Sequence, residues 1–242
     1  MRAVLTLMRR ELAYYLRSPM GYLIIAVTLV IDGLLFNAWA IGTAERKSSE
    51  VLEIFFYCAS GTTLLASVFI SMRLIAEERQ NGTLVLLLTS PLKDYQLVLG
   101  KYLSALAFLA ILTLITLYMP ALVMIRGKIS VGHIVSGYLG LLLLGGTTIA
   151  LGLLCSSFSP NQLTAAILSA AVITTFILLW LLSRIASPPV EEVLAYLAIH
   201  DKHFKPFMRG LISIQDVIFY LSLTYVALLL ATRSLESRRW HS

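Results

Sequence analysis

Charged side chains are scarce in this chain of 242 residues: Asp, Glu, Lys and Arg make up 13% of it, against roughly 25% in ordinary soluble domains. Hydrophobic residues make up 58%, and the mean hydropathy is +0.85. So little charge excludes a water-soluble globular domain of this size. Such high hydrophobicity also excludes a disordered chain, because disorder needs low hydrophobicity. We therefore expect an integral membrane protein.

Cysteine is nearly absent as well. The two cysteines, Cys58 and Cys155, both lie in apolar stretches, so they indicate neither a disulfide framework nor a metal cluster. His200 and His203 lie near Asp201, but this spacing is only weakly indicative of a metal site. We expect no bound metal.

Common catalytic motifs are missing too. The sequence contains no GxxxxGK[ST] loop, no HExxH and no GxSxG, which mark P-loop ATPases, zinc proteases and serine hydrolases respectively. We therefore expect a protein that is not itself an enzyme.

The net charge of +6 does not indicate a nucleic-acid partner, because the basic residues form no single run. They flank apolar segments instead, which is the pattern that sets membrane topology. A spanning helix needs about 20 apolar residues. The sequence predicts an all-α membrane protein, a single domain over 1–242 with six transmembrane helices, near residues 20–40, 54–76, 95–123, 135–156, 163–182 and 212–231.

The first span could be mistaken for a cleaved signal peptide, since Ala38 and Ala40 match the small-x-small cleavage pattern. Its apolar core is longer than the 7–15 residues typical of signal peptides, so we expect a retained span. Pro120 lies near the far end of the third span, where it predicts a kink.

Residues 1–18 are too polar to span. Apolar residues recur there at helical spacing beside several arginines, which predicts an amphipathic helix lying in the membrane interface. Ser18 and Pro19 then end it. Residues 184–211 form another non-spanning stretch with a one-sided apolar stripe, and we expect short helices there that lie on or dip into the membrane.

Orientation follows from the basic residues. A cytoplasmic N-terminus places eleven of the 19 Lys and Arg residues on the cytoplasmic side and eight on the other. This bias favours cytoplasmic N- and C-termini, which an even number of spans requires.

The segment 76–101, between the second and third spans, is the most informative. Glu77 and Glu78 fall at the predicted C-terminal end of a helix, where the helix dipole disfavours acids. We therefore expect a compensating base, and Arg9 or Arg10 of the interfacial helix is the natural choice.

A break at Gly82 follows. Leu84, Leu87 and Leu88 then give one apolar face to a helix too short to span, and Pro91 suits the first turn of the next helix. From physics alone, two interpretations stay open: a knob that docks a soluble partner, or an ordinary solvated loop.

These residues carry a resemblance. EERQNGTLVLLLTSPLKDYQLVLGKYL (77–103) resembles the first cytoplasmic loop of ABC-2 type transporter permeases. RRELAYYLRSPMGYLI (9–24), GYLGLLLLGGTTIALGLLCSSFSPNQLTAAIL (137–168), and FMRGLISIQDVIFYLSLT with the terminal SRRW (207–224, 237–240) resemble the gliding-motility-type branch of that family. The four blocks are spread over nearly the whole chain and follow the family's order.

The resemblance implies a permease subunit of an exporter-type complex in a bacterial inner membrane. Its partners would be cytoplasmic ABC ATPase subunits, which bind ATP and Mg²⁺, and a second permease, either a copy or a homologue. The loop 77–94 would couple the ATPase to the spans, the helix 1–18 would be the connecting helix, and 184–211 would form the short outer helices. The residues implied in ATPase coupling are Glu77, Glu78, Arg79, Gly82, Thr83, Leu84, Leu87, Leu88, Pro91 and Asp94, with Arg9, Arg10 and Glu11 in the connecting helix.

Asp32 is the clear ionisable residue within a span, where a charge costs about 2.5–3.5 kcal/mol on insertion scales. Two interpretations stay open: a position on the translocation path, or a structural hydrogen bond. Two other functions also stay open for the whole chain: an ATP-driven motility or scaffold component that transports nothing, and a stand-alone secondary transporter or channel.

Overall fold

The computed structural model describes residues 2–41, 47–83, 93–126 and 129–239, and throughout these ranges the regular structure is helical. Within these ranges, five helices lie before residue 84 and seven lie after residue 92. The elements are α1 (Arg2–Arg17), α2 (Pro19–Leu35), the π-helix η1 (Phe36–Ile41), α3 (Ser48–Ser71), α4 (Ala76–Gln80), α6 (Asp94–Ile115), α7 (Tyr118–Arg126), α8 (Val131–Phe158), α9 (Gln162–Ser183), α10 (Val190–Leu197), α11 (Lys205–Met208) and α12 (Ile214–Arg239).

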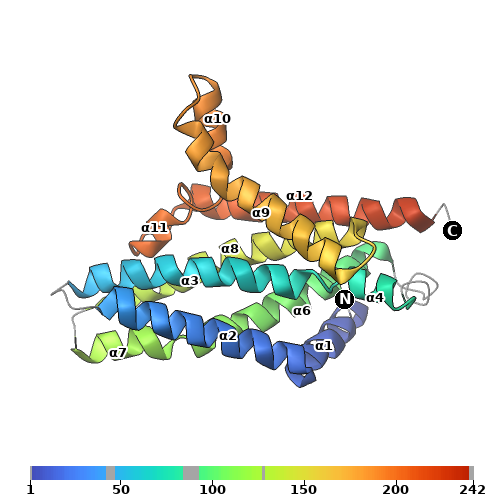
Figure 1. The fold of residues 1–242 in the computed structure, drawn as a ribbon, viewed down its shortest axis with the longest axis horizontal. Coiled ribbons are helices and arrows are strands. Elements are labelled where there is room, and N and C mark those ends of the chain that lie inside the picture. Colours follow the sequence, from blue (N-terminus) through green and yellow to red (C-terminus); the bar gives the residue numbers. More distant parts are fainter. Residues whose placement is uncertain (1, 42–46, 84–92, 127–128, 240–242) are drawn as a thin grey trace.

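Within these described residues, six helical segments are long and apolar enough to cross a membrane, which confirms the predicted number and order of spans. Most of them lie along the long axis of the molecule (Figure 1). The segments are Pro19–Trp39, Ser48–Gln80, Asp94–Ile125, Val131–Phe158, Gln162–Ser183 and Ile214–Ser237.

α3 and α8 form the centre of the bundle. In the most apolar stretch of each of these spans, 72% and 78% of the residues are buried inside the protein, against 17% for α9. Small residues on α8 allow this approach: a methyl group added at Gly152 would overlap the Ser71 side chain, and one at Gly137 would overlap the Phe56 ring. The glycines of the fourth span therefore serve close helix packing.

Two spans are interrupted. The second turns at 72–75 and resumes as α4, and the third breaks between α6 and α7. Pro120 has no N–H to bond the carbonyl of Thr116, which instead accepts a hydrogen bond from the N–H of Met119 at 3.0 Å. The kink predicted from Pro120 is thus confirmed, about one turn before the proline.

α1 packs along α6 and ends where the sequence predicts. Ser18 caps α2 by accepting a hydrogen bond from the N–H of Gly21 at 3.1 Å, with Pro19 in the first turn. Leu7 and Tyr15 are the buried residues of α1, whereas Leu5 and Leu16, from the predicted apolar stripe, are exposed. The helix therefore packs on the bundle with one face and leaves apolar side chains free for the interface.

The stretch 184–211 contains α10 and α11. α10 packs against α9 in the part that projects from the bundle, and the chain then returns toward the bundle at α11 (Figure 1), which packs on α8 and α3. The predicted short helices are present.

Candidate functional site

Four helices meet around α4. Its charged side chains face α1 and α6, and its first residues lie against the end of α8. A cavity of about 280 Å³ lies between α1, α4 and α6, lined by Arg10, Glu11, Tyr14, Tyr15, Arg73, Leu74, Glu77, Glu78, Asn81 and Lys101. We call Glu11, Arg73, Glu77, Glu78 and Lys101 the charge cluster.

Arg73 holds Glu77. Its Nε lies 2.8 Å from Glu77 Oε2 and its Nη2 lies 3.1 Å from Oε1, a two-point contact that fixes the carboxylate plane. The Tyr14 hydroxyl also donates to Glu77 Oε1 at 3.3 Å, and the guanidinium lies over the rings of Tyr14 and Tyr15. The start of α4 is thereby joined to the end of α1.

Lys101 holds Glu78. Although it carries a charge, Lys101 is only 2% exposed. Its Nζ donates to Glu78 Oε1 at 2.7 Å and lies 3.7 Å from Glu11 Oε1. A buried base in α6 therefore joins an acid of α4 to an acid of α1.

The prediction that Arg9 or Arg10 compensates Glu77 and Glu78 is wrong. Arg10 pairs with its neighbour Glu11 at 2.8 Å, and the direct partners are Arg73 and Lys101. The premise was wrong too: the break at 72–75 places both acids in the first turn of α4, instead of at the end of a longer helix. Bases within the spans' own ends therefore supply the direct counter-charge, and Arg10 of α1 adds only a smaller attraction to Glu78.

Arg79 makes a different contact from its acidic neighbours. Its Nη1 and Nη2 donate to the carbonyls of Ser159 and Ser157 at 2.7 and 2.8 Å. These carbonyls lie at the C-terminal end of α8, where backbone acceptors have no partner within the helix. Arg79 therefore joins α4 to the end of the central helix α8.

Ser156 adds further hydrogen bonds between the end of α8 and the start of α4, and this role was not predicted from the sequence. Its Oγ accepts hydrogen bonds from the N–H groups of Ile75 and Ala76 at 3.1 and 2.9 Å and donates to the carbonyl of Met72 at 3.1 Å. One hydroxyl thus satisfies backbone groups freed where the second span is interrupted.

α4 ends as predicted. Gly82 has φ +71°, a left-handed conformation that side chains disfavour, and the Thr83 hydroxyl donates back to the Glu78 carbonyl at 3.3 Å. Leu84, Leu87, Leu88 and Pro91 lie outside the described residues. Asp94 is the first residue of α6, which begins the third span.

Asp32 lies in α2 and is 4% exposed. The Thr62 hydroxyl of α3 donates to its Oδ1 at 2.7 Å. A hydrogen bond between neighbouring spans therefore exists at this position, as one of the two interpretations expects.

The opposite end of the bundle is held by histidines. His203 Nδ1 lies 2.6 Å from Asp216 Oδ1, and its Nε2 lies 2.8 Å from the carbonyl of Tyr196. His200 Nε2 lies 2.8 Å from the Ser60 hydroxyl. These contacts tie the chain between α10 and α12 to the bundle; we call them the histidine contacts.

No metal site is formed by these histidines: among the residues that the structure describes, no group of three His, Cys, Asp or Glu side chains could hold an ion. His203 pairs with Asp216 on α12, while Asp201 lies 3.7 Å from His200. The weak histidine spacing noted in the sequence reflects packing contacts.

Comparison with known proteins places the chain in a family. A family model described as "ABC-2 family transporter protein" matches residues 15–231, which includes five of the six spanning segments, most of the sixth, and the charge cluster apart from Glu11. No curated protein matches the chain. Since the matched region covers far more than half of the sequence, the chain belongs to the ABC-2 family of transporter proteins.

Proposed function

We propose that this protein is the transmembrane permease subunit of an exporter-type complex driven by a separate ABC ATPase. ABC-2 proteins are membrane transport components, and this chain has the six spans of a multi-pass membrane protein. ATP and Mg²⁺ would bind to the partner, and the chain would contribute no catalytic residue. The partners would be cytoplasmic ATPase subunits and a second permease, either identical or homologous.

The charge cluster carries the coupling proposal. A docked ATPase would act on the loop 77–94, whose described start is α4. Because α4 is bonded to α1 through Glu77, to α6 through Glu78 and to α8 through Arg79, displacement of α4 would move three helices together. α8 is the central helix, so motion at the loop would reach the core of the bundle.

The cluster also suits this role energetically. A charged group in a buried position loses several kcal/mol of hydration, and its ion pair restores this only when the geometry is kept. Displacement of α4 is therefore opposed by all of its ion-pair partners together, and the contacts would not break one by one. α4 would then move as a rigid unit.

The proposal also includes the orientation of the protein in the membrane and its branch within the family. The family resemblance favours a bacterial inner membrane, and the basic residues favour an orientation with both termini and the loop 77–94 in the cytoplasm. The residues of 9–24, 137–168 and 207–224 favour the gliding-motility-type branch. The stretch 184–211, with α10, would then lie at the outer face.

The test is ATPase stimulation in a reconstituted complex. Gly82→Pro, which denies the φ of +71°, and Glu78→Lys, which reverses the partner of Lys101, should both abolish stimulation while membrane insertion is kept. Glu191→Lys is the matched control, because it reverses an exposed acid on α10 at the opposite end. Wild-type stimulation by all three variants would contradict the proposal.

The partner is identified by purifying the tagged protein from native membranes in mild detergent. An ABC ATPase should accompany it in near-equal amounts and should be lost when Leu84 and Leu87 are both changed to Asp. Recovery of a stable, folded protein without any ATPase would favour a channel or secondary transporter instead.

A further inference from the structure

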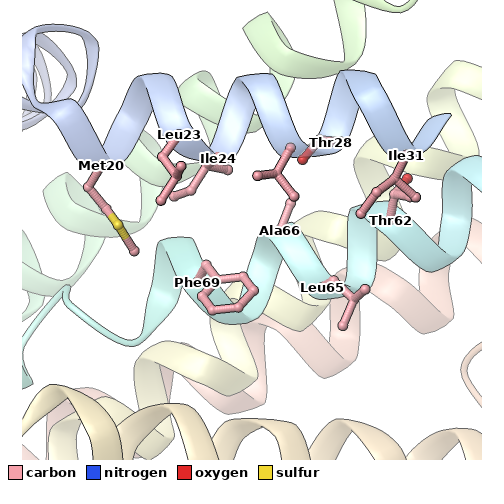
Figure 2. A pocket seen from close by; sticks show the side chains of 10 residues that line it. Met20, Leu23, Ile24, Thr28, Ile31, Thr62, Leu65, Ala66 and Phe69 are labelled. Atoms are coloured by element: carbon pink, nitrogen blue, oxygen red, sulfur yellow. The ribbon is translucent and has the colours of Figure 1, made fainter. Parts of the chain in front are cut away.

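A groove runs between α2 and α3 on the surface of the spanning region, from the α1 end of α2 toward its middle. It has a volume of about 180 Å³, and Figure 2 shows the side chains of the two helices facing one another across it. Leu23, Leu65 and Phe69 are 56%, 57% and 46% exposed, so the groove opens sideways. Its lining consists of Met20, Leu23, Ile24, Val27, Thr28, Ile31, Thr62, Leu65, Ala66 and Phe69.

The lining is apolar over nearly the whole groove. The Thr62 hydroxyl bonds Asp32 Oδ1 at 2.7 Å and lies 3.0 Å from the carbonyl of Ala59. Its hydrogen-bonding capacity is therefore directed into the protein. Lined by aliphatic and aromatic side chains, the groove suits a hydrocarbon, in the way that dry apolar cavities of about 150 Å³ bind small apolar molecules.

Ala66 creates the space. It lies on α3 in the middle of the groove, opposite the α2 side chains (Figure 2), between the larger Leu65 and Phe69 that flank it. Ala66 is itself buried at the base of the groove, so a larger side chain there would extend into the groove.

The length of the groove matches one leaflet of a bilayer. The α2 lining residues run from Met20 to Ile31, which is about 16 Å at 1.5 Å per residue, and this is close to half of the roughly 30 Å hydrocarbon core. Because Met20 lies just after the end of α1, the leaflet is the one on the α1 side. A chain lying here would run from the interface to the middle of the membrane.

The interfacial end of the groove is basic. Arg17 is exposed and ends α1, three residues before Met20, and Arg9 and Arg10 are also exposed on that helix. Of these, Arg10 already pairs with Glu11. Exposed arginines at the membrane surface attract anionic lipid headgroups.

From the shape, length, apolar lining and neighbouring charge, we propose that this groove binds one acyl chain of an anionic phospholipid from the leaflet on the α1 side, with its headgroup near Arg17. The occupant comes from the bilayer that surrounds the spans. The site does not involve the ATPase partner. A negative result in the lipid tests would therefore leave the proposed function untouched, and failure of the proposed function would leave this site untouched.

The first test fills the groove. Ala66→Leu should lower the amount of anionic phospholipid retained by the purified protein at least several-fold, measured by native mass spectrometry after delipidation and addition of phosphatidylglycerol. Ala171→Leu is the matched control, because Ala171 is exposed on α9, far along the chain from the groove. Equal retention by wild type and both variants would overturn the proposal.

The second test leaves the groove intact and so does not depend on the folding of Ala66→Leu. Arg17→Gln should remove the preference for phosphatidylglycerol over phosphatidylcholine while total retained lipid stays similar. An unchanged preference would show that Arg17 does not bind the headgroup and would overturn that part of the proposal.

The third test identifies the occupant directly. A photo-reactive phenylalanine analogue at Leu65, in wild-type background and in native membranes, should form adducts with the mass of a phospholipid. A cross-linked dimer in place of lipid adducts would show that a second copy covers the groove, and the lipid proposal would be wrong.

Discussion

The two ends of the bundle are held together by different chemistry. At the α4 end, Arg73 and Lys101 bind carboxylates at 2.8 and 2.7 Å. At the α11 end, His203 binds Asp216 and His200 binds Ser60. The α4 end is therefore held by ion pairs, and the α11 end by hydrogen bonds of histidine side chains. Burial lowers the pKa of His200, so its contact responds to pH.

The difference fits the proposed roles of the two ends. A contact that passes movement from an ATPase should be kept through each cycle, and separating a buried ion pair is strongly unfavourable. The other end only has to keep the chain between α10 and α12 in place. The predictions below separate the two ends by changing one at a time.

The largest effect is expected at Lys101. Lys101→Met would leave Glu78 and Glu11 without their shared base, and breaking a buried ion pair costs about 3 kcal/mol or more. The apparent free energy of unfolding in detergent should fall by this amount, and the double variant Lys101→Met, Glu78→Leu should recover part of it. Lys47→Met, at an exposed helix start with no side-chain cap bond, should change little. An equal fall in the free energy of unfolding for Lys101→Met and Lys47→Met would contradict the role of the charge cluster.

A smaller and localised effect is expected at His203. His203→Leu removes both contacts of the ring and leaves Asp216 buried without its partner, at a cost of about 2 kcal/mol for bonds that involve a charged group. Amide hydrogen exchange should rise over 198–211 and stay unchanged over 73–83. Equal loosening of both ranges would show that the two ends are not independent.

The effect at Gly82 is smaller still. A side chain at φ +71° costs about 1 kcal/mol, although nothing lies within 4 Å of the added carbon. Gly82→Ala should therefore destabilise slightly. Gly61→Ala, equally unhindered but inside α3, should stabilise by a similar amount, and thermal unfolding of the pair measures the difference. If Gly82→Ala and Gly61→Ala changed the melting temperature in the same direction, the argument from the backbone conformation of Gly82 would be wrong.

The smallest effect is expected from pH. Burial lowers the pKa of His200 below its ordinary value of 6.5. The nearby Asp201 raises this pKa in part, and Lys205 lowers it further. The unfolded chain then takes up the proton first as the pH falls. Stability from neutral His200 is full above about pH 6.5 and is lost as the pH drops toward the lower pKa of the folded protein.

The measurement compares wild type with His200→Gln, which keeps a hydrogen-bonding group beside Ser60 but does not titrate. The melting temperature of wild type should fall more between pH 7.5 and 5.5 than that of the variant. Parallel curves would mean that His200 does not carry the pH dependence.

The sequence predicted the fold well, because long apolar runs define spans by length alone. Pro120, Ser18 and Gly82 also predicted local breaks, since their backbone limits act within a few residues. The partners of Glu77 and Glu78 were not predicted correctly. Arg73 stands four residues before Glu77, so helical spacing was an available signal.

Lys101 gave no such signal. It lies 23 residues after Glu78 and 90 after Glu11, so their contact depends on how α1, α4 and α6 pack. At a span end, a lysine also resembles an ordinary topology-setting charge. For the same reason Asp216 was missed as the partner of His203, because Asp201 stands closer in sequence but is not its bonding partner.

The coupling role of the charge cluster is tested most directly by exchanging one ion pair. ATPase stimulation would be measured in the reconstituted complex for Glu78→Lys, for Lys101→Glu and for the double exchange, with partner binding checked in each. We expect both single variants to retain the ATPase but lose stimulation, and the double exchange to regain much of it. Stimulation at the wild-type level in both single variants would contradict the account.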